Sequence, residues 1–428
     1  MPIFTLSPLF RTRRFLPLFV TQFFGAFNDN ALKNAFVIWY TYAVALKAGI
    51  NPSMMVTMAG GIFILPFFLL SAPAGAIADK YERSWLTRRI KAFEILLMIT
   101  CSAGFYLGNI PLLLVTIFLM GVHSTFFGPI KYSLLPEHLQ KSELISGNGW
   151  IEGGTFLSIL LGTIFGGVVI LTHHGVWWLS GAITLFAVTG FIASLSIPKA
   201  RIAEPDLHIG FNIFHQTYRL LSFARKERML WHTIICISWF WFIGATFLTQ
   251  LPVYTASVIH GNEHVVTLFL TIFSIGIGLG SVACNKLLNG KIDCRLVPYG
   301  TVGMSIAIVL FTAATRLFIQ DVPAPATLMD ASTFLSTFYG WLIVTSLLTL
   351  AVMSGIYIVP LYALLQNRSE PRVLARMIAS NNIMNSFFMV VASLSAMLLF
   401  SHGFTVSDIL LITGAVNLLL LLVLRKIK

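Results

Sequence analysis

The chain is built from about twelve long apolar runs separated by short polar stretches. The centres of these runs fall near residues 30, 67, 98, 121, 160, 186, 243, 275, 305, 350, 387 and 416. Each run meets the roughly 20 residues that an α-helix needs to cross a bilayer. The strands of a membrane barrel would instead alternate apolar and polar residues. The pattern predicts an all-α polytopic membrane protein with about twelve transmembrane helices.

Composition supports this class. Of the 428 residues, 57% are hydrophobic and 10% are charged, whereas a soluble domain carries about 25% charged residues. The first apolar run, from about Phe15 to Leu46, is too long for a secretory signal peptide and contains Asp29. We therefore expect this run to be the first membrane helix.

The longest polar connection divides the runs into two groups of six. It predicts an N-terminal six-helix bundle at residues 1–197, a cytoplasmic linker at 198–228 and a C-terminal six-helix bundle at 229–428. Within the linker, apolar residues repeat at helical spacing and bases lie between them. These apolar residues are Phe211, Phe214, Tyr218 and Leu221. The spacing predicts an amphipathic helix, either on the inner leaflet or simply covering the bundle.

Weak internal repeats relate the two groups. Gly25-Ala26 in the first run is echoed by Gly244-Ala245 in the seventh, and the segment Pro129–Leu135 by Pro360–Leu365. Two parallel, pseudo-symmetric halves are typical of major facilitator transporters, whose substrates bind near the membrane midplane between the repeats. We expect that fold here.

Charge predicts the orientation of the chain. The net charge of +12 comes from 28 lysines and arginines against 16 acids. In the predicted topology every base except Lys33, Lys47 and Arg316 lies on one side of the membrane. The positive-inside rule places that side, with both termini, in the cytoplasm. The distribution favours contact with anionic membrane lipids and not with nucleic acid.

A charged motif follows the second run. Gly75 and the pair Asp79-Lys80 are followed by the basic pair Arg88-Arg89. The arrangement resembles the major facilitator signature after helix 2, in which an acid at a helix end pairs with bases as a breakable latch. The wider spacing here leaves the partner of Asp79 open. Positive-inside charge alone would explain the bases but not Gly75 and Asp79.

Polar residues within the first run are the main functional candidates. An acid at membrane depth costs at least about 2.5 kcal/mol and usually faces a partner or an aqueous cavity. Asp29 is therefore predicted to lie on the pathway of a polar substrate, a coupling ion or a proton. The alternative is an ion pair with Lys33, one turn further on; Lys33 could instead bind a phosphate. Asn28, Asn30 and Gln22 are further candidates for the pathway.

Later runs carry fewer polar groups. Gln250, Asn381 and Asn385 are candidates either for the pathway or for hydrogen bonds between helices. Glu152, at the cytoplasmic start of the fifth run, could pair with Lys131 as a gate. It could equally lie in a solvated helix start, where acids are favoured.

Enzyme signatures are missing from the sequence. There is no Walker loop, and no catalytic triad or metal cluster stands in the short loops. The four cysteines, Cys101, Cys236, Cys284 and Cys294, lack zinc-like spacing. We expect a transporter without a cofactor or a metal, not an enzyme.

Three motifs resemble the bacterial lysophospholipid transporter (LplT) family. They are Phe24-Gly25-Ala26-Phe27-Asn28-Asp29-Asn30, Lys131-Tyr132-Ser133-Leu134-Leu135-Pro136 and Val359-Pro360-Leu361-Tyr362-Ala363-Leu364-Leu365-Gln366. The segment Ser238–Thr246 is similar to the branch whose transporter domain is fused to a phospholipid acyltransferase and an acyl-carrier-protein (acyl-ACP) synthetase.

The resemblance implies a function. Lysophosphatidylethanolamine-type lipids would be flipped from the outer to the inner leaflet of the bacterial inner membrane by alternating access, and then re-acylated. The family's helix-1 acid falls on Asp29, whereas the helix-7 arginine of the standalone members falls on Leu248, so Lys33 could replace that cation. Because the sequence ends at Lys428 without the fused enzymes, an acyltransferase/acyl-ACP synthetase is expected as a separate cytoplasmic partner.

Two other functions fit the same residues. The first is a major facilitator carrier for another amphiphile or a small solute. The second is a non-transporting membrane scaffold that docks a lipid acyltransferase on its basic cytoplasmic face. A scaffold should tolerate Asp29→Asn but not the neutralisation of Arg88 and Arg89.

Overall fold

The computed structural model describes residues 8–45, 53–210, 212–322 and 328–427. Within these ranges the regular structure is helical. Eleven helical segments are long and apolar enough to cross a membrane. Helix α1 (Leu16–Trp39) is not among them, because polar side chains dilute its hydropathy. Together with α1 these segments account for the predicted twelve, and the all-α membrane fold is confirmed.

The chain folds into two compact units. Unit 1 comprises residues 1–147, 157–225 and 366–383, and unit 2 comprises residues 148–156, 226–365 and 384–428. Two long helices, α6 (Leu144–Val169) and α14 (Leu374–Ser401), each contribute to both units. The predicted linker boundary at 198–228 stays a prediction.

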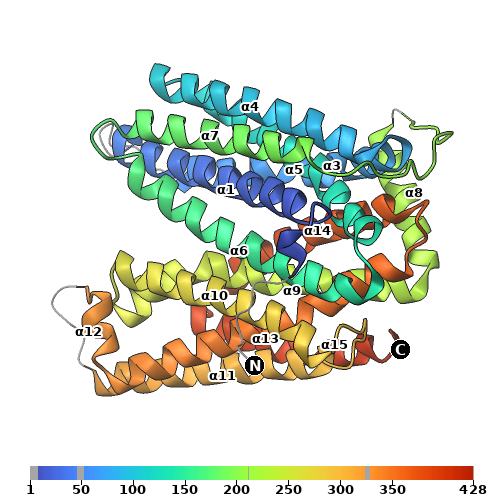
Figure 1. Cartoon of the computed structure of the whole chain (residues 1–428). Helices are drawn as coiled ribbons and strands as arrows, with labels where there is room; N and C mark the ends of the chain where they lie inside the picture. The colour runs from blue at the N-terminus through green and yellow to red at the C-terminus, as the bar shows by residue number, and fades with distance from the viewer. Residues whose placement is uncertain (1–7, 46–52, 211, 323–327, 428) are drawn as a thin grey trace. The chain divides into compact units, whose positions relative to one another are not determined.

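Unit 1 is built around five long helices. Beside α1 these are α3 (Ser53–Lys80), α4 (Arg83–Leu107), α5 (Ile110–His138) and α7 (Gly175–Leu195). Helix α7 packs against both α1 and α4, and α5 packs against α3 and α4 (Figure 1). Their shared core is apolar and includes Phe36, Met98 and Ile183.

Short turns and small residues allow this packing. Gly108 ends α4 with φ 60°, a left-handed conformation that suits glycine, and the Asn109 side chain then caps α5 by accepting from the Leu112 N–H at 3.0 Å. A Cβ on Gly162 of α6 would lie 2.4 Å from the Phe27 carbonyl oxygen of α1. Gly166 approaches the Ala31 carbonyl in the same way. Glycines therefore let α6 lie directly against α1.

Smaller elements complete unit 1. They are η1 (Pro8–Arg11), the π-helical turn η2 (Tyr40–Ala45), η3 (Lys141–Glu143) and α8 (Ile213–Lys226). Helix α8 is the helix predicted in the linker; Phe211 lies outside the described residues. Leu220 and Leu221 pack against the bundle, while Phe214 and Tyr218 are 74% and 71% exposed. The structure thus has α8 covering the bundle with one face.

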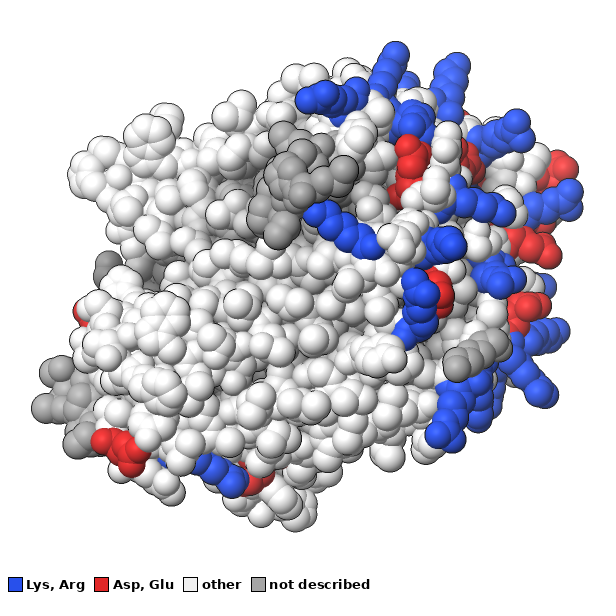
Figure 2. Space-filling model, turned by 60° about the horizontal axis from the view of Figure 1, so that its bottom comes forward, with Lys and Arg blue, Asp and Glu red and all other residues white. Residues whose placement is uncertain are grey.

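Unit 2 holds the remaining helices. They are α9 (Arg228–Tyr254), the π-helical turn η4 (Thr255–Ile259), α10 (Glu263–Leu287), α11 (Val297–Asp321), α12 (Ala331–Leu335), α13 (Phe338–Arg368) and α15 (Val406–Leu424). Helix α15 packs against α9 and α11. On the face drawn in Figure 2, most of the visible Lys and Arg side chains gather in one region, and most of the remaining surface is uncharged.

Candidate functional site

Helix α1 presents its polar residues to different neighbours. Consecutive residues step about 100° around a helix, so Asn28 and Asp29 cannot face the same way. The Asn28 side chain is buried and donates to the Ile183 carbonyl of α7 at 3.1 Å. The half-buried Asp29 faces Ser124 of α5, whose hydroxyl lies 2.7 and 2.9 Å from the two carboxylate oxygens.

Lys33 does not form the ion pair that its spacing from Asp29 allows. Among the described ion pairs none joins these two side chains within 4 Å. The Lys33 ammonium instead lies 4.1 Å from the centre of the Phe63 ring of α3. The two opposite charges therefore stay distinct on the surface of α1.

A second charged pair lies behind Asp29. Lys91 and Glu94 of α4 are fully buried, with 2.6 Å between Nζ and Oε2. The Lys91 ammonium also lies 4.8 Å from the centre of the Phe127 ring. From the sequence we counted Lys91 among the bases of the cytoplasmic side, as part of the loop before the third run; that placement in a loop was wrong, because Lys91 lies in the third turn of α4 and faces inward. Its position at the end of a run rich in bases concealed this role.

A hydrogen bond connects this pair to α1, and a close contact with His123 connects it to α5. Asn28 Nδ2 donates to Glu94 Oε1 at 2.9 Å. The buried His123 ring lies between the two carboxylates, with Nε2 3.3 Å from Glu94 Oε2 and Nδ1 3.4 Å from the Ser124 hydroxyl oxygen. We call this set the polar network; its members are Asn28, Asp29, Lys91, Glu94, His123 and Ser124.

Gly25 makes room for the network. A Cβ at this position would lie 2.4 Å from the Lys91 ammonium nitrogen and 3.9 Å from Glu94 Oε2. The glycine in the first motif thus has a physical reason: it lets α1 approach the buried charges of α4. Gly244 occupies the corresponding position in the second half of the sequence, but no neighbour requires a glycine there, because an added Cβ would meet nothing within 4 Å.

The predicted latch acid has well-defined partners. Asp79, at the end of α3, accepts from Arg83 Nη2 at 3.0 Å and from Arg376 Nε at 3.0 Å. It also accepts from the backbone N–H groups of Ala375 and Arg376 at 3.1 and 3.2 Å, and so caps the start of α14. Gly75 permits this approach, because an added Cβ would lie 2.5 Å from the Ala379 Cβ.

The basic pair predicted to bind Asp79 lies elsewhere. Arg88 reaches toward the Leu195 carbonyl at 3.4 Å, and the Arg89 guanidinium lies 5.1 Å from the Trp85 ring centre. The half-buried Lys80 ends α3. The two bases that bind Asp79 are instead Arg83, one helical turn later in the sequence, and Arg376, 297 residues away.

Further acids extend the latch. Glu137 of α5 pairs with Arg83, and Glu204 pairs with Arg376. Glu82 caps α4 through the N–H groups of Ser84 and Trp85 and also accepts from the Ala200 N–H at 2.9 Å. Burial opposes ionisation of Glu82, but these N–H groups outweigh it and hold the pKa of that carboxyl below its ordinary value. The segment after α7 is thus tied to the ends of α3, α4 and α5.

The other candidates are dispersed. Gln22 is buried in α1, and Gln250 is half-buried in α9. Asn30 Nδ2 donates to the Ala26 carbonyl of its own helix. Asn381 is buried in the unit 1 part of α14, whereas Asn385 belongs to unit 2 and accepts from the Ser238 hydroxyl at 2.9 Å.

The predicted gate pair stays a prediction. The Lys131 ammonium lies 4.7 Å from the centre of the Tyr132 ring in unit 1. Glu152 is fully buried and belongs to unit 2.

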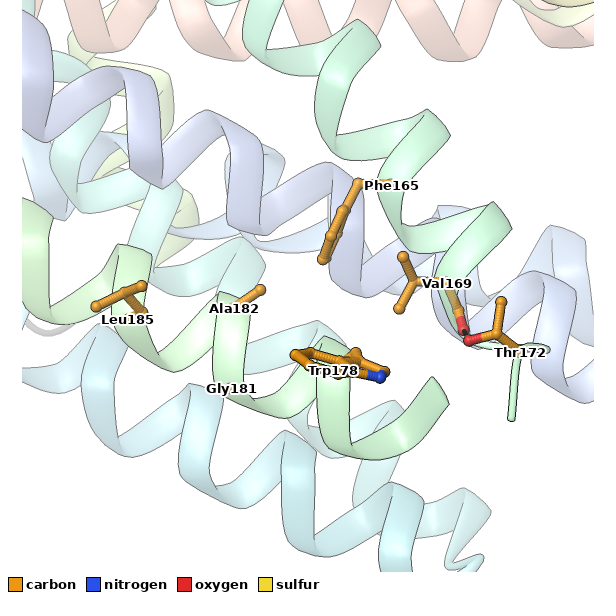
Figure 3. A pocket seen from close by; sticks show the side chains of 7 residues that line it. All are labelled: Phe165, Val169, Thr172, Trp178, Gly181, Ala182 and Leu185. Atoms are coloured by element: carbon orange, nitrogen blue, oxygen red, sulfur yellow. Dashed lines mark hydrogen bonds between the residues drawn. The ribbon is translucent and has the colours of Figure 1, made fainter. Parts of the chain in front are cut away.

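An apolar pocket of about 460 Å³ lies between α6 and α7. In Figure 3, Phe165 and Val169 of α6 face Trp178 and Ala182 of α7. Thr172, Gly181 and Leu185 complete the lining. Within the described residues no group of three or more His, Cys, Asp or Glu side chains could hold a metal ion.

These features define a polytopic helical membrane protein with a charged network buried inside one bundle of spans. The chain belongs to the Major Facilitator Superfamily, whose family model matches residues 18–393. The predicted major facilitator fold is thereby confirmed.

Curated relatives and solved structures agree with this assignment. The lysophospholipid transporters LplT of Escherichia coli K12 and of Shigella boydii serotype 18 are each 28% identical over 361 residues, covering 83% of this chain and 80% of the relative. The structure is similar to that of the human organic anion transporter MFSD10, with a TM-score of 0.75 and 12% identity over 96% of this chain and 99% of that one. It is also similar to the structure of the transporter FucP in the outward conformation, with a TM-score of 0.73 and 11% identity over 97% of this chain and 100% of that one.

Proposed function

We propose that this protein transports lysophospholipids across the inner membrane of a bacterium. The observation that carries the proposal is the similarity to lysophospholipid transporters over 83% of the chain, together with an acid at Asp29 backed by the polar network. The movement runs from the outer to the inner leaflet by alternating access. The basic side of the chain and both termini lie in the cytoplasm, because 28 lysines and arginines are distributed so asymmetrically.

The headgroup binds at α1. An ethanolamine ammonium binds at Asp29 and the phosphate at Lys33, since the two charges lie one turn apart and do not neutralise each other by direct contact. The single acyl chain lies against apolar surface, for which the pocket at Phe165 and Trp178 is one candidate. No step requires a cofactor or chemistry on the lipid, so this chain acts as a carrier and not as an enzyme.

The latch controls access. Asp79 binds both Arg83 and Arg376, and its hydrogen bonds to the first N–H groups of α14 make it a switchable cap. Breaking and re-forming this cap accompanies the alternation between the two access states. Delivered lysolipids are re-acylated by a separate acyltransferase/acyl-ACP synthetase on the cytoplasmic side.

Leaflet-resolved uptake tests the substrate class. Spheroplasts lacking their own lysolipid transporter are supplied with labelled lysophosphatidylethanolamine, and uptake is compared between the protein and empty membranes. Unlabelled lysolipids and other amphiphiles serve as competitors. We expect uptake that only lysolipids inhibit. Uptake equal to that of empty membranes would reject the proposal, and inhibition by unrelated amphiphiles alone would indicate a different carrier.

Lys33→Gln tests how the headgroup is bound. Loss of the phosphate partner should weaken uptake and alter headgroup preference, while the exposed loop variant Lys291→Gln should behave like the wild type. Unchanged uptake and preference in Lys33→Gln would remove Lys33 from the site.

A further inference from the structure

Three buried groups behind Asp29 have no role in headgroup binding as described above. Glu94 and His123 are buried near the middle of α4 and α5, as Asp29 is near the middle of α1, and the buried Lys91 lies one turn before Glu94. Lys91 and Glu94 already satisfy each other at 2.6 Å, with Asn28 as a further donor. Each charge of this pair is compensated by the other without a third ionisable group. The presence of His123 between Glu94 and Asp29 therefore needs a separate explanation.

The hydrogen bond between Ser124 and Asp29 limits how the His123 ring can bond to its neighbours. A serine hydroxyl has one hydrogen to donate, and the 2.7 and 2.9 Å distances direct the hydrogen of Ser124 toward Asp29. The His123 Nδ1 atom, 3.4 Å from the same oxygen, can then form a hydrogen bond with it only by donating. The Nε2 atom lies 3.3 Å from Glu94 Oε2 and also faces an acceptor.

Both ring nitrogens of His123 thus face acceptors when both carboxylates are ionised. A neutral imidazole carries one hydrogen and can serve only one of them. The buried Nε2 atom makes no hydrogen bond to any described residue, although the carboxylate is within ion-pair distance. A second proton on the His123 ring would let both ring nitrogens donate, one to the Ser124 oxygen and the other to Glu94.

We propose that the polar network is a proton site coupled to the substrate at Asp29. His123 takes up the proton. In a transfer step Nδ1 gives its proton to the Ser124 oxygen while the Ser124 hydroxyl gives its own to an Asp29 oxygen. Imidazolium and carboxylate become neutral imidazole and carboxylic acid, so charge and atoms balance. This inference rests on the proposed function, in which Asp29 must be ionised to bind a cationic headgroup.

The surroundings of His123 favour this role. The charged side chains next to His123 are Glu94, with its partner Lys91, and Asp29, which His123 reaches through Ser124. Lys33 lies one turn after Asp29 in α1, over the Phe63 ring. The described spans of α3 and α7 at this level carry no ionisable side chain. Imidazole is the side chain that changes charge nearest neutral pH. A proton and a substrate cation therefore compete for the charge on Asp29, and lysolipid binding releases a proton.

A substrate-independent measurement tests the proton site first. The ring nitrogens are observed by NMR in purified protein with ¹⁵N-labelled histidine, and His123→Gln identifies the signals of His123. We expect His123 to titrate reversibly, and its midpoint to shift in Asp29→Asn. The shift should disappear when Ser124→Ala is present in both proteins. A His123 ring fixed in one neutral tautomer from about pH 5 to pH 9 would overturn the proposal even if transport is confirmed.

Binding then tests the coupling. With lysophosphatidylethanolamine, the affinity of the wild type should fall by up to about tenfold per pH unit on the acid side, as expected for exchange of one proton. His123→Gln should flatten this dependence, whereas the exposed control His402→Gln should retain it. An unchanged slope in a folded His123→Gln protein would refute the coupling. Failure of the wild type to bind lysolipid at any pH would instead refute the proposed function.

Discussion

Unit 1 and unit 2 each contain a buried polar cluster, and the two clusters differ in charge and in the completeness of their hydrogen bonds. In unit 2, Asn417 donates to the Thr301 carbonyl at 2.8 Å and to the Ser305 hydroxyl at 2.9 Å, and accepts from Trp239 at 3.0 Å. All these groups are neutral, and each described atom of Asn417 has a partner. The polar network of unit 1 is charged, and the buried Asn28 Oδ1 and His123 Nε2 have no hydrogen bond to any described residue.

This difference in charge and hydrogen bonding distinguishes a cluster that stabilises helix packing from one that has a function. A buried neutral cluster with complete hydrogen bonds adds stability and fixes helix positions. A buried charged cluster costs desolvation free energy and is weak evidence for stability. We therefore assign a structural role to the Asn417 cluster and a functional role to the network. Three changes test that contrast, and a fourth tests a charged cap outside both clusters.

The largest effect should come from separating Lys91 and Glu94. Lys91→Met or Glu94→Gln leaves one charge buried without its partner, which costs about 3–5 kcal/mol. The double variant Lys91→Met/Glu94→Leu removes both charges and should recover most of that stability. Chemical unfolding in detergent micelles measures the difference. A double variant as unstable as the sum of the single ones would contradict this account.

Loss of Asn417 should lower stability but spare transport. Asn417→Ala leaves the Trp239 N–H without its acceptor and should cost about 1–3 kcal/mol of unfolding free energy. Lysolipid uptake per folded molecule should stay at the wild-type level. A selective loss of uptake in a stable protein would show that the neutral cluster is functional after all.

The repeated glycines should respond unequally. Gly25→Ala forces a methyl group against the Lys91 ammonium, which Glu94 holds in place, and should cost about 1–3 kcal/mol. Gly244→Ala is the matched control at the equivalent position of the repeat, and it should be neutral or slightly stabilising because glycine is a poor helix former. Thermal unfolding of the two variants side by side checks this; equal losses would argue against a special role for Gly25.

The smallest effect concerns a cap outside the spans. Glu82→Gln should cost about 1 kcal/mol at neutral pH, because the ionised cap is the stronger acceptor. The folded pKa of Glu82 lies below its unfolded value, so its contribution is present above the unfolded pKa and is lost as pH falls through the folded pKa. The difference between wild type and variant should shrink in acid. Glu227→Gln, at an N-cap whose side chain makes no cap hydrogen bond, should cost less than Glu82→Gln at neutral pH.

The sequence predicted the helices and the key acid of α1, but not its surroundings. Apolar run length is a local property, and an acid within a run is conspicuous, so α1 and Asp29 could be found. Lys91 and Glu94 were hidden because the positive-inside rule already explained a base near the start of α4. The signals that could have revealed them are their spacing of three residues on one face and His123 within the apolar run of α5.

The latch was also predicted only in part, because the sequence shows local patterns but not contacts between distant residues. The motif pointed to Gly75 and Asp79, but Arg376 lies 297 residues from Asp79, and no local pattern indicates that contact. Arg83 stands one helical turn after Asp79 and could have been found by spacing alone. The basic pair Arg88-Arg89 was more conspicuous and drew the prediction away from it.

We propose that Asp29, held by Ser124 and backed by the polar network, is the acid on the lysolipid pathway. The most direct test compares uptake of labelled lysophosphatidylethanolamine by purified wild-type and Asp29→Asn proteins reconstituted in vesicles, at equal amounts of folded protein. The half-exposed loop variant Asp293→Asn, outside the spans, serves as the matched control. We predict that Asp29→Asn reduces uptake to the level of empty vesicles while Asp293→Asn transports normally. Uptake by Asp29→Asn at the wild-type rate would contradict the account.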